Sequence, residues 1–308
     1  MKRSVSLAQG FVAGAARMGT VLAIVLTAAC RTGHNYVDPA GPRYAGGHAA
    51  DPVVVGGVTT LRVVTFNIEH AREIESATAL LHEDPDLRHA DVILLQEMDA
   101  PGVRRIALEL ALEYVYYPAI YHFREGNDFG NAILSRWPIV DDEKIVLPYL
   151  ALATGIQRIA AAATLCVAGS AVRVYSIHLG TVAEILPGER RSQLRAVLAD
   201  AADHARVIVG GDMNDADVGR VASAGGFDWP TRRGRRTATL GRWDHIFSRG
   251  LVPATGESTG TVLDNRGSSD HRPVWTVLSL DRDGDTAAER CDAGAITGRP
   301  FKPLAMRR

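Results

Sequence analysis

Short apolar runs recur between about residues 60 and 280, and turn residues separate them. Runs of this length, rich in β-branched residues, are typical of strands. The run at 91–97 is apolar over most of its length, so we expect a strand buried on both faces. The predicted strands are Leu61–Asn67, Asp91–Glu97, Asn131–Ser135, Ile159–Cys166, Val172–His178, Arg206–Gly211, Trp243–Phe247 and Pro273–Leu280.

Helical periodicity is less frequent. Helices are predicted at Arg72–Leu81, Val103–Leu112 and Glu189–Ala202. The last is the clearest, because Leu194, Val197, Leu198 and Ala201 form an apolar stripe at helical spacing. Many strands and few helices over about 220 residues favour two packed sheets with helices outside them.

The first thirty residues read as a targeting segment. Basic residues precede the apolar sequence GTVLAIVLTAA, which ends at Cys30. Residues 1–30 are therefore predicted to be a secretory signal peptide. The sequence LTAAC resembles a bacterial lipobox, with Cys30 as the lipidated residue. An uncleaved membrane anchor is the alternative, but the stretch is short for a span. We expect export to the cell envelope as a membrane-anchored lipoprotein, or otherwise secretion.

The rest of the 308-residue chain divides into three parts. Residues 31–58 are predicted to be a flexible linker, residues 59–281 one domain, and residues 282–308 a loosely ordered tail. Cys30, Cys166 and Cys291 are too few and too scattered to predict a disulfide framework, and no CxxC pair suggests zinc. With 34 basic and 35 acidic residues the chain is nearly neutral, which argues against a general polyanion binder. We expect a monomer.

Polar side chains stand where the predicted strands begin or end. Each alone has an ordinary explanation, such as a cap, a turn or a satisfied histidine. If they meet at one rim of the sheets, they form a site. The residues concerned are Asn67, Glu97, His178, Asp212, Asn214, Asp244, Asp270 and His271.

The order of these motifs resembles the endonuclease/exonuclease/phosphatase superfamily. The matching elements are TFN (65–67), LLQE (94–97), GNAILSRWPI (130–139), IHL (177–179), GGDMN (210–214), WDHIF (243–247) and SDHRPV (269–274). The resemblance implies an α/β fold, a four-layer α/β/β/α sandwich of two packed mixed β-sheets flanked by helices. It also implies a divalent-metal-dependent phosphoesterase. Mg²⁺ prefers oxygen ligands such as a carboxylate, and Mn²⁺ is an alternative.

The resemblance also implies roles for individual residues. Glu97 would be the principal metal ligand, with Asn67 nearby and Asp270 at a second metal position or orienting the water. Asp212 would position or deprotonate that water, and Asn214 would hold a phosphate oxygen. His178 would donate a hydrogen bond to the phosphate. His271 would contact the phosphate and would be polarised by Asp244. Asp212 and His271 remain competing candidates for the general base.

Asn131 and Arg158 are further candidates for substrate binding. A structural turn is an equal explanation for Asn131, and an exposed salt bridge is an alternative for Arg158. Arginines crowd the segment 232–242, which suits phosphate contacts or a solvated loop. A nuclease acting on DNA or RNA, a sphingomyelinase-like phospholipid phosphodiesterase and a non-catalytic binding module on the same fold are the remaining alternatives to a generic exported phosphoesterase.

Overall fold

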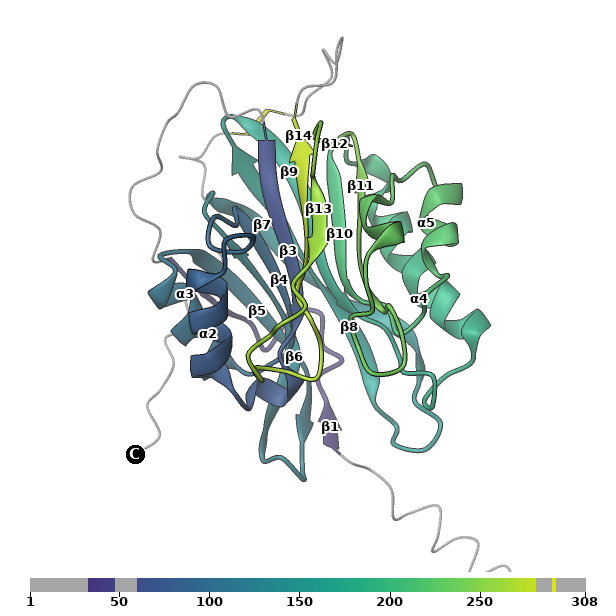
Figure 1. Cartoon of the computed structure of the whole chain (residues 1–308). Helices are drawn as coiled ribbons and strands as arrows, with labels where there is room; N and C mark the ends of the chain where they lie inside the picture. The colour runs from purple at the N-terminus through teal and green to yellow at the C-terminus, as the bar shows by residue number, and fades with distance from the viewer. Residues whose placement is uncertain (1–32, 48–59, 281–289, 292–308) are drawn as a thin grey trace, which may run out of the picture.

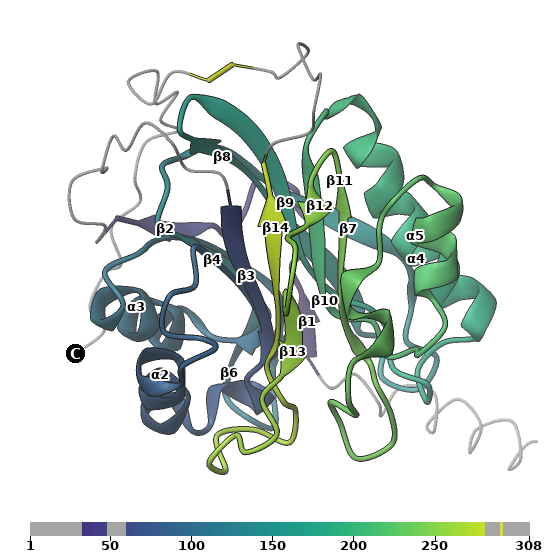
Figure 2. The ribbon, with the colours of Figure 1, turned by 45° about the horizontal axis from the view of Figure 1, so that its top comes forward.

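The computed structural model describes residues 33–47, 60–280 and 290–291, and Figure 1 shows the whole chain. Two β-sheets face each other, and a helical layer covers the outer face of each (Figures 1 and 2). This confirms the fold class predicted from the sequence. None of the helices in the described ranges is long and apolar enough to cross a membrane.

The first sheet contains nine strands in the order β1-β5-β6-β4-β3-β14-β12, with β2 paired to β5 and β13 to β14. Strands β3 and β4 are parallel, whereas β14 is antiparallel to β3. The strand bounds are β1 Gly33–Asn35, β2 Tyr44–Gly46, β3 Thr60–Asn67, β4 Val92–Met98, β5 Glu113–His122, β6 Asn127–Ser135, β12 Val252–Pro253, β13 Thr259–Thr261 and β14 Val274–Ser279.

The second sheet has five strands in the order β11-β10-β9-β8-β7. Strands β9 and β10 are parallel, and β11 runs antiparallel to β10. The strand bounds are β7 Ile139–Leu150, β8 Gln157–Val167, β9 Ser170–His178, β10 Val207–Asp212 and β11 Asp244–Arg249. Each sequence-predicted strand has its counterpart, but β1, β2, β5, β7, β12 and β13 were not predicted.

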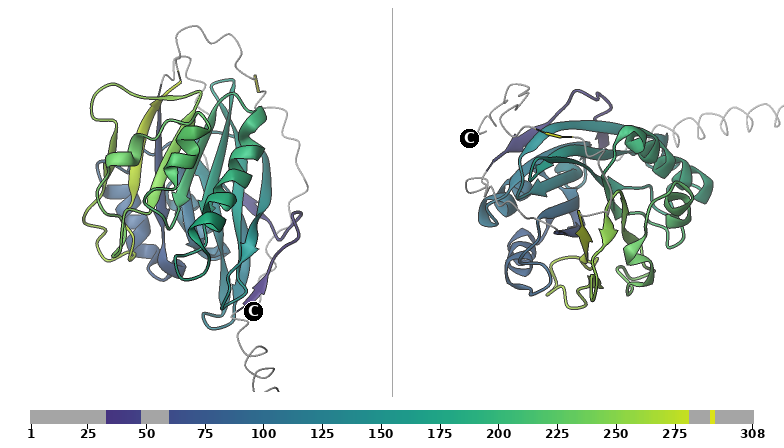
Figure 3. Two further views of the ribbon diagram at one scale, coloured as in Figure 1. Left: turned by 90° about the vertical axis from the view of Figure 1, so that its right-hand side faces the viewer. Right: turned by 90° about the horizontal axis from the view of Figure 1, so that it is seen from above.

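Helices α2 (Ile74–Glu83) and α3 (Ala100–Glu109) cover the first sheet, and α4 (Pro187–Asp200) and α5 (Gly219–Ala224) cover the second (Figure 3). Asp99 caps α3, because its Oδ1 accepts from the Gly102 amide at 2.8 Å. Three 3₁₀ turns complete the elements, at Glu69–Ala71, Ala201–Asp203 and Pro230–Arg233. The helices α2, α3 and α4 confirm the sequence prediction within a few residues.

Three apolar layers hold the sandwich together. The central layer lies between the sheets and includes Leu94 of β4 and Ile208 of β10, both fully buried. The outer layers join α2 and α3 to the first sheet and α4 and α5 to the second. Gly210 lets the sheets approach closely, because a Cβ there would lie 2.6 Å from the Leu94 side chain. The close packing places side chains from both sheets together at their common rim.

Part of the predicted linker is folded. Strands β1 and β2 both pair with β5, so the prediction of a flexible linker is wrong for residues 33–47. Lys144 of β7 holds this arm, since its buried ammonium donates to the carbonyls of Tyr36 (2.9 Å) and Gly41 (2.6 Å). The apolar pattern gave no sign of this, because backbone pairing at a sheet edge requires no apolar periodicity. The predicted signal peptide lies outside the described residues.

A disulfide joins Cys166 at the end of β8 to Cys291. The Cys291 N–H also donates to the Gly169 carbonyl in the β8–β9 turn at 3.2 Å. The sequence did not predict this bond, because the two cysteines are 125 residues apart and only the fold brings them together. The predicted loose tail therefore has at least one covalent attachment to the second sheet, and the rest of it lies outside the described residues.

Candidate active site

Strand direction brings the polar strand ends to one rim. Parallel strands β3 and β4 end there in the first sheet, and β9 and β10 end there in the second. In the second sheet Asp212 is the register partner of both His178 and Asp244. These three residues share the strand face that carries the central apolar layer, so they point toward the first sheet.

Glu97 reaches the site through an irregularity in β4. Residue 96 faces the central layer, where the Gln96 amide donates to Ser176 Oγ of the second sheet at 3.0 Å. Strict alternation would therefore turn residue 97 away. Instead, the β4–β6 register shifts between Leu95 and Met98, and Glu97 has a φ of 59°. A bulge of this kind re-aims a side chain, and left-handed backbone at a non-glycine residue costs on the order of 1–3 kcal/mol.

Asn67 connects the carboxylates of the two sheets. Its Nδ2 lies 3.0 Å from Glu97 Oε1 and 3.2 Å from Asp212 Oδ2. Asn67 is fully buried and Glu97 partly buried. Two oxygen-bearing groups from separate sheets thus converge on one amide, and the amide is the group that holds them at a fixed separation.

The 3₁₀ turn that follows Asn67, Glu69–Ala71, supports this centre. The backbone N–H of His70 donates to Glu97 Oε2 at 3.1 Å, and its Nε2 lies 3.6 Å from the same oxygen. The backbone of Glu69, His70 and Ala71 is left-handed at each residue. Sequence reasoning missed His70, although it stands three residues after Asn67 in the TFNIEH sequence.

Asp212 lies between two histidines. Its Oδ2 is 3.4 Å from His178 Nε2 and 3.7 Å from His271 Nε2. Its Oδ1 accepts from the backbone N–H of Asn214 at 2.8 Å. Burial, with the nearby Asp244 charge as the next cause, raises the pKa of Asp212 to about 7. This carboxylate therefore changes its protonation state near neutral pH.

His271 is paired with a buried carboxylate. Its Nδ1 lies 2.8 Å from Asp244 Oδ2, and Asp244 is 1% exposed. Burial opposes the charge of His271, but Asp244 and then Asp212 outweigh it and raise the pKa of His271 to about 10. Asp244 Oδ1 is buried without a hydrogen-bond partner among the described residues. His271 is therefore cationic at neutral pH.

His178 lies beside a cation, whereas His271 lies beside a carboxylate. Arg158 Nη1 lies 3.2 Å from His178 Nδ1, and Arg158 Nη2 donates to Glu184 Oε2 at 2.8 Å. Burial, reinforced by the Arg158 charge, holds the pKa of His178 well below its usual range. His178 is consequently neutral. Arg158 forms a buried salt bridge, which corrects the exposed one considered from the sequence, and no sequence pattern had singled out Glu184.

The remaining predicted residues lie at the edges of this centre. Asn214 Nδ2 donates to the Leu179 carbonyl at 3.0 Å, and Asp270 is exposed on the rim with its backbone N–H donating to Glu69. Asn131 is 2% exposed, and its amide donates to the carbonyls of Ile159 (2.9 Å) and Ser176 (3.1 Å). Its amide therefore ties the sheets together, and a role of Asn131 in substrate binding stays a prediction.

Two groups of side chains have the chemistry to hold a divalent cation. The first is the carboxylate pair Glu97 and Asp212, which offers oxygens of the kind Mg²⁺ prefers, with Asn67 Nδ2 between them and Asn67 Oδ1 accepting from the Glu69 N–H. The second is Asp212, Asp244 and His271, whose ligand atoms all lie within 4.8 Å of one another. In this second group His271 Nδ1 and Asp244 Oδ2 already engage each other. The first group therefore fits a hard cation better, and the second is suited to handling protons.

Comparison with known proteins agrees with this architecture. Residues 64–271 match the Endonuclease/Exonuclease/phosphatase family, and the chain belongs to that family. None of the functionally curated proteins matches the chain in sequence.

Solved structures show the same fold at low sequence identity. An endonuclease/exonuclease/phosphatase from Beutenbergia cavernae is 22% identical, with 72% of each chain covered and a TM-score of 0.58. D. rerio TDP2 complexed with a single-strand DNA product is 20% identical, covering 71% of this chain and 98% of its own, with a TM-score of 0.56. The human Nocturnin catalytic domain with a bound sulfate anion is 18% identical, covering 71% and 94%, with a TM-score of 0.51.

Proposed function

We propose that the protein is an exported phosphoesterase that uses a divalent metal ion and a water molecule to hydrolyse a phosphodiester or phosphomonoester. The observation that carries the proposal is the position of Asp212, between a neutral and a cationic histidine and one amide away from Glu97. Membership of the Endonuclease/Exonuclease/phosphatase family supports it.

The residues divide the chemistry among themselves. Asp212, whose pKa is about 7, accepts the proton of the attacking water. His271 keeps its proton under the same conditions and donates a hydrogen bond from Nε2 to an oxygen of the phosphate, while Asp244 holds its Nδ1. This assigns the base to Asp212 rather than His271. A Mg²⁺ or Mn²⁺ ion held by the Glu97 carboxylate, with Asn67 beside it, would neutralise phosphate charge, and Asp270 borders that position.

His178 and Arg158 contribute differently. A neutral His178 donates a hydrogen bond from one ring nitrogen to a phosphate oxygen without adding charge. Arg158 supplies the positive charge on that side and remains fixed by Glu184. Asn214 completes the set, because its backbone N–H orients Asp212.

Mutation of the proposed metal ligand tests the function directly. Glu97→Gln is expected to reduce hydrolysis of bis(p-nitrophenyl) phosphate with Mg²⁺ by at least about 10²-fold, because it removes the anionic oxygen ligand. Activity should also vanish in EDTA and return with Mg²⁺ or Mn²⁺. The matched control is Glu257→Gln, at an exposed residue of the β12–β13 loop. EDTA-resistant turnover, or equal rates for the two variants, would contradict the proposal.

Nucleic acid is the second candidate substrate class, favoured by one surface feature. Arg232, Arg233, Arg235 and Arg236 are exposed, and the Arg272 backbone next to His271 donates to Thr237 in the same segment. The segment therefore borders the site, and arginine forks suit phosphate contacts. The relative with a single-strand DNA product agrees with this choice. Single-stranded DNA, RNA, plasmid and sphingomyelin vesicles, assayed in parallel, separate a nuclease from a phospholipid phosphodiesterase.

The disulfide supports export. Such bonds persist in oxidising compartments outside the cytosol, and Cys166 and Cys291 are joined in this chain. Lipidation at Cys30 would then place the domain at a membrane surface. Mass spectrometry of the protein from a membrane fraction, before and after Cys30→Ala, tests that step: a diacylglyceryl mass increment on Cys30 is expected. The monomeric state remains a prediction from the sequence.

A further inference from the structure

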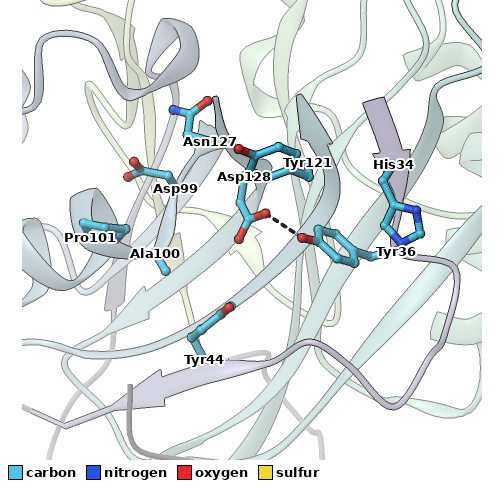
Figure 4. Close-up of a pocket in the computed structure, with 9 residues that line it drawn as sticks. All are labelled: His34, Tyr36, Tyr44, Asp99, Ala100, Pro101, Tyr121, Asn127 and Asp128. Atoms are coloured by element: carbon cyan, nitrogen blue, oxygen red, sulfur yellow. Dashed lines mark hydrogen bonds between the residues drawn. The ribbon is translucent and has the colours of Figure 1, made fainter. Parts of the chain in front are cut away.

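A cavity lies outside the proposed active site, on the helix-covered face of the first sheet. Its volume is about 640 Å³, and Figure 4 shows its lining side chains. The lining residues are His34, Tyr36, Tyr44, Asp99, Ala100, Pro101, Tyr121, Asn127 and Asp128. They come from the β1–β2 arm, the start of α3 and the β5–β6 hairpin, so three separate chain segments border the space.

The arm is a fixed wall of this cavity. The Tyr36 N–H donates to the Ala119 carbonyl of β5 at 2.8 Å, and the Tyr36 hydroxyl donates to Asp128 Oδ1 at 2.9 Å (Figure 4). Buried Lys144 fixes the same segment from behind, through the Tyr36 carbonyl. Because both the backbone and the side chain of Tyr36 are held, the cavity is shaped before any ligand enters.

The charge in the cavity is negative. Asp99 and Asp128 both line it, whereas no lysine or arginine is among the lining residues. Asn127 beside them has its Oδ1 buried without a hydrogen-bond partner in the described ranges. The lining is thus rich in acceptors and lacks a compensating cation.

The remaining walls are aromatic. The rings of Tyr36, Tyr44 and Tyr121 line the space, and His34 stands edge-on to Tyr36 with ring centroids 5.5 Å apart. Aromatic faces attract cations through their quadrupole, most strongly where water is displaced. Carboxylates and aromatic rings together suit a cation with an organic body, whereas Mg²⁺ and Ca²⁺ require more oxygen ligands.

We propose that this cavity binds a small organic ammonium ion, held by the carboxylates of Asp99 and Asp128 and by the three tyrosine rings. The space is within the usual range for small-molecule sites, roughly 300–1,000 Å³. It is separate from the proposed phosphoesterase centre, because none of its lining residues belongs to that centre.

The backbone nevertheless connects the two sites closely. Asp128 precedes Phe129, whose ring lies 5.7 Å from the His178 ring, and Asp99 follows Glu97 by two residues. Strand alternation turns Asp128 into the cavity and Phe129 toward the active site. A ligand in the cavity would therefore contact one face of the strand ends whose other face carries Glu97 and Phe129.

Calorimetric titration with n-butylammonium and tetramethylammonium chloride, in EDTA and at constant ionic strength, tests the proposal without using catalysis. Saturable binding of at least one probe is expected. Asp128→Asn and Asp99→Asn should each weaken it by at least about fivefold, since each removes a charge facing the cation. Tyr121→Leu should weaken it about threefold without changing any charge. The control is Asp203→Asn, at an exposed position on the second sheet's side of the molecule, and it should bind as the native protein does.

Asp99→Asn alters the α3 cap as well as the cavity, so thermal unfolding of each variant is measured alongside. Tyr121→Leu keeps the test informative if Asp99→Asn unfolds, because Tyr121 is on a hairpin and 37% exposed. Three results would overturn the proposal: no saturable binding of either probe, binding unaffected by Asp128→Asn and Tyr121→Leu, or stronger binding of Ca²⁺ that the same variants abolish. A phosphoesterase that binds no ammonium ion would refute this inference alone and leave the proposed activity standing.

Discussion

The two sides of the active site place the same residue type in opposite surroundings. On one side His271 faces Asp244 and has a pKa raised to about 10, whereas on the other His178 faces Arg158 and has a lowered pKa. Both histidines are buried, and both lie within 3.7 Å of one oxygen of Asp212. Burial alone would disfavour the charged form of each, so the neighbouring charge decides which of them is cationic.

In the proposed mechanism this difference separates proton transfer from phosphate recognition. The His271 side holds a charged donor beside a carboxylate that titrates near pH 7. The His178 side holds a neutral ring beside a fixed guanidinium. Perturbed titration of paired groups is common at catalytic centres. Substitutions that remove the shared carboxylate of Asp212, or the charged neighbour of one histidine, test this division.

Asp212→Asn is expected to have the largest effect. It removes the proposed base and the anion that both histidines face, so kcat for bis(p-nitrophenyl) phosphate should fall by up to about 10⁴-fold. The variant should remain folded, because the asparagine is nearly isosteric and avoids burial of a charge. Steady-state kinetics with circular dichroism check both points. A loss below about tenfold would exclude Asp212 as the base.

Asp244→Asn should reduce kcat by about 10²-fold and shift its pH dependence. In the native protein Asp212 is ionised above about pH 7 and His271 protonated below about pH 10, which predicts a bell-shaped profile between these values. Without the Asp244 charge the pKa of both groups falls, so both limbs should move to lower pH. Unmoved limbs would mean that other groups titrate.

Arg158→Met should have a smaller effect, about tenfold on kcat/KM, since a charge-assisted hydrogen bond contributes roughly 1.5–3 kcal/mol. It also removes a cation that lowers the pKa of His178, so that pKa should rise. Histidine ¹⁵N chemical shifts measured against pH report this directly.

Arg158→Met leaves Glu184 buried and unpaired, so Arg158→Met/Glu184→Gln is the matched control. Both variants should show the same increase in the His178 pKa. If neither shows it, burial alone sets the state of His178.

The last expected effect is on stability rather than on rate. The folded-state pKa of Asp212 is raised from 3.8 to about 7, so its contribution is fully present below about pH 4 and is lost as pH rises through 7. Asp212→Asn should abolish that decline, and its stability advantage over the native protein should grow from pH 4 to 7. Urea unfolding in EDTA across this range measures it. An advantage that stays constant with pH would mean that Asp212 titrates alike in both states.

Much of the fold was predictable because most core strands carry short apolar runs. Strand β5 was missed although it is largely buried, since its aromatic run contains Pro118 at a register shift and a following exposed Tyr121. Strand β7 was missed because its middle, DDEK, is polar. The β1–β2 arm was missed because backbone pairing with β5 leaves no apolar pattern.

The site residues that stand at strand ends or in sequence motifs were predictable. Asn67, Glu97, His178, Asp212 and His271 lie together because parallel strands end at one rim. Partners on irregular loops were not predictable. Glu184 lies on such a loop, and no periodic sequence pattern indicates that it pairs with Arg158. The charge states depend on which neighbours meet in space, and the sequence contains that information only through the fold. The Cys166–Cys291 bond has the same origin.

Glu97 combines a strained backbone conformation with a side chain that the proposed function requires. A left-handed conformation favours glycine, so Glu97→Gly would relieve backbone strain while it removes the carboxylate on which the proposed metal site depends. The same substitution would leave the Asn67 side-chain amide and the His70 N–H without the carboxylate to which they donate, so lost hydrogen bonds offset the relief of the backbone. The side chain that offers the ligand therefore also anchors its own unusual backbone conformation.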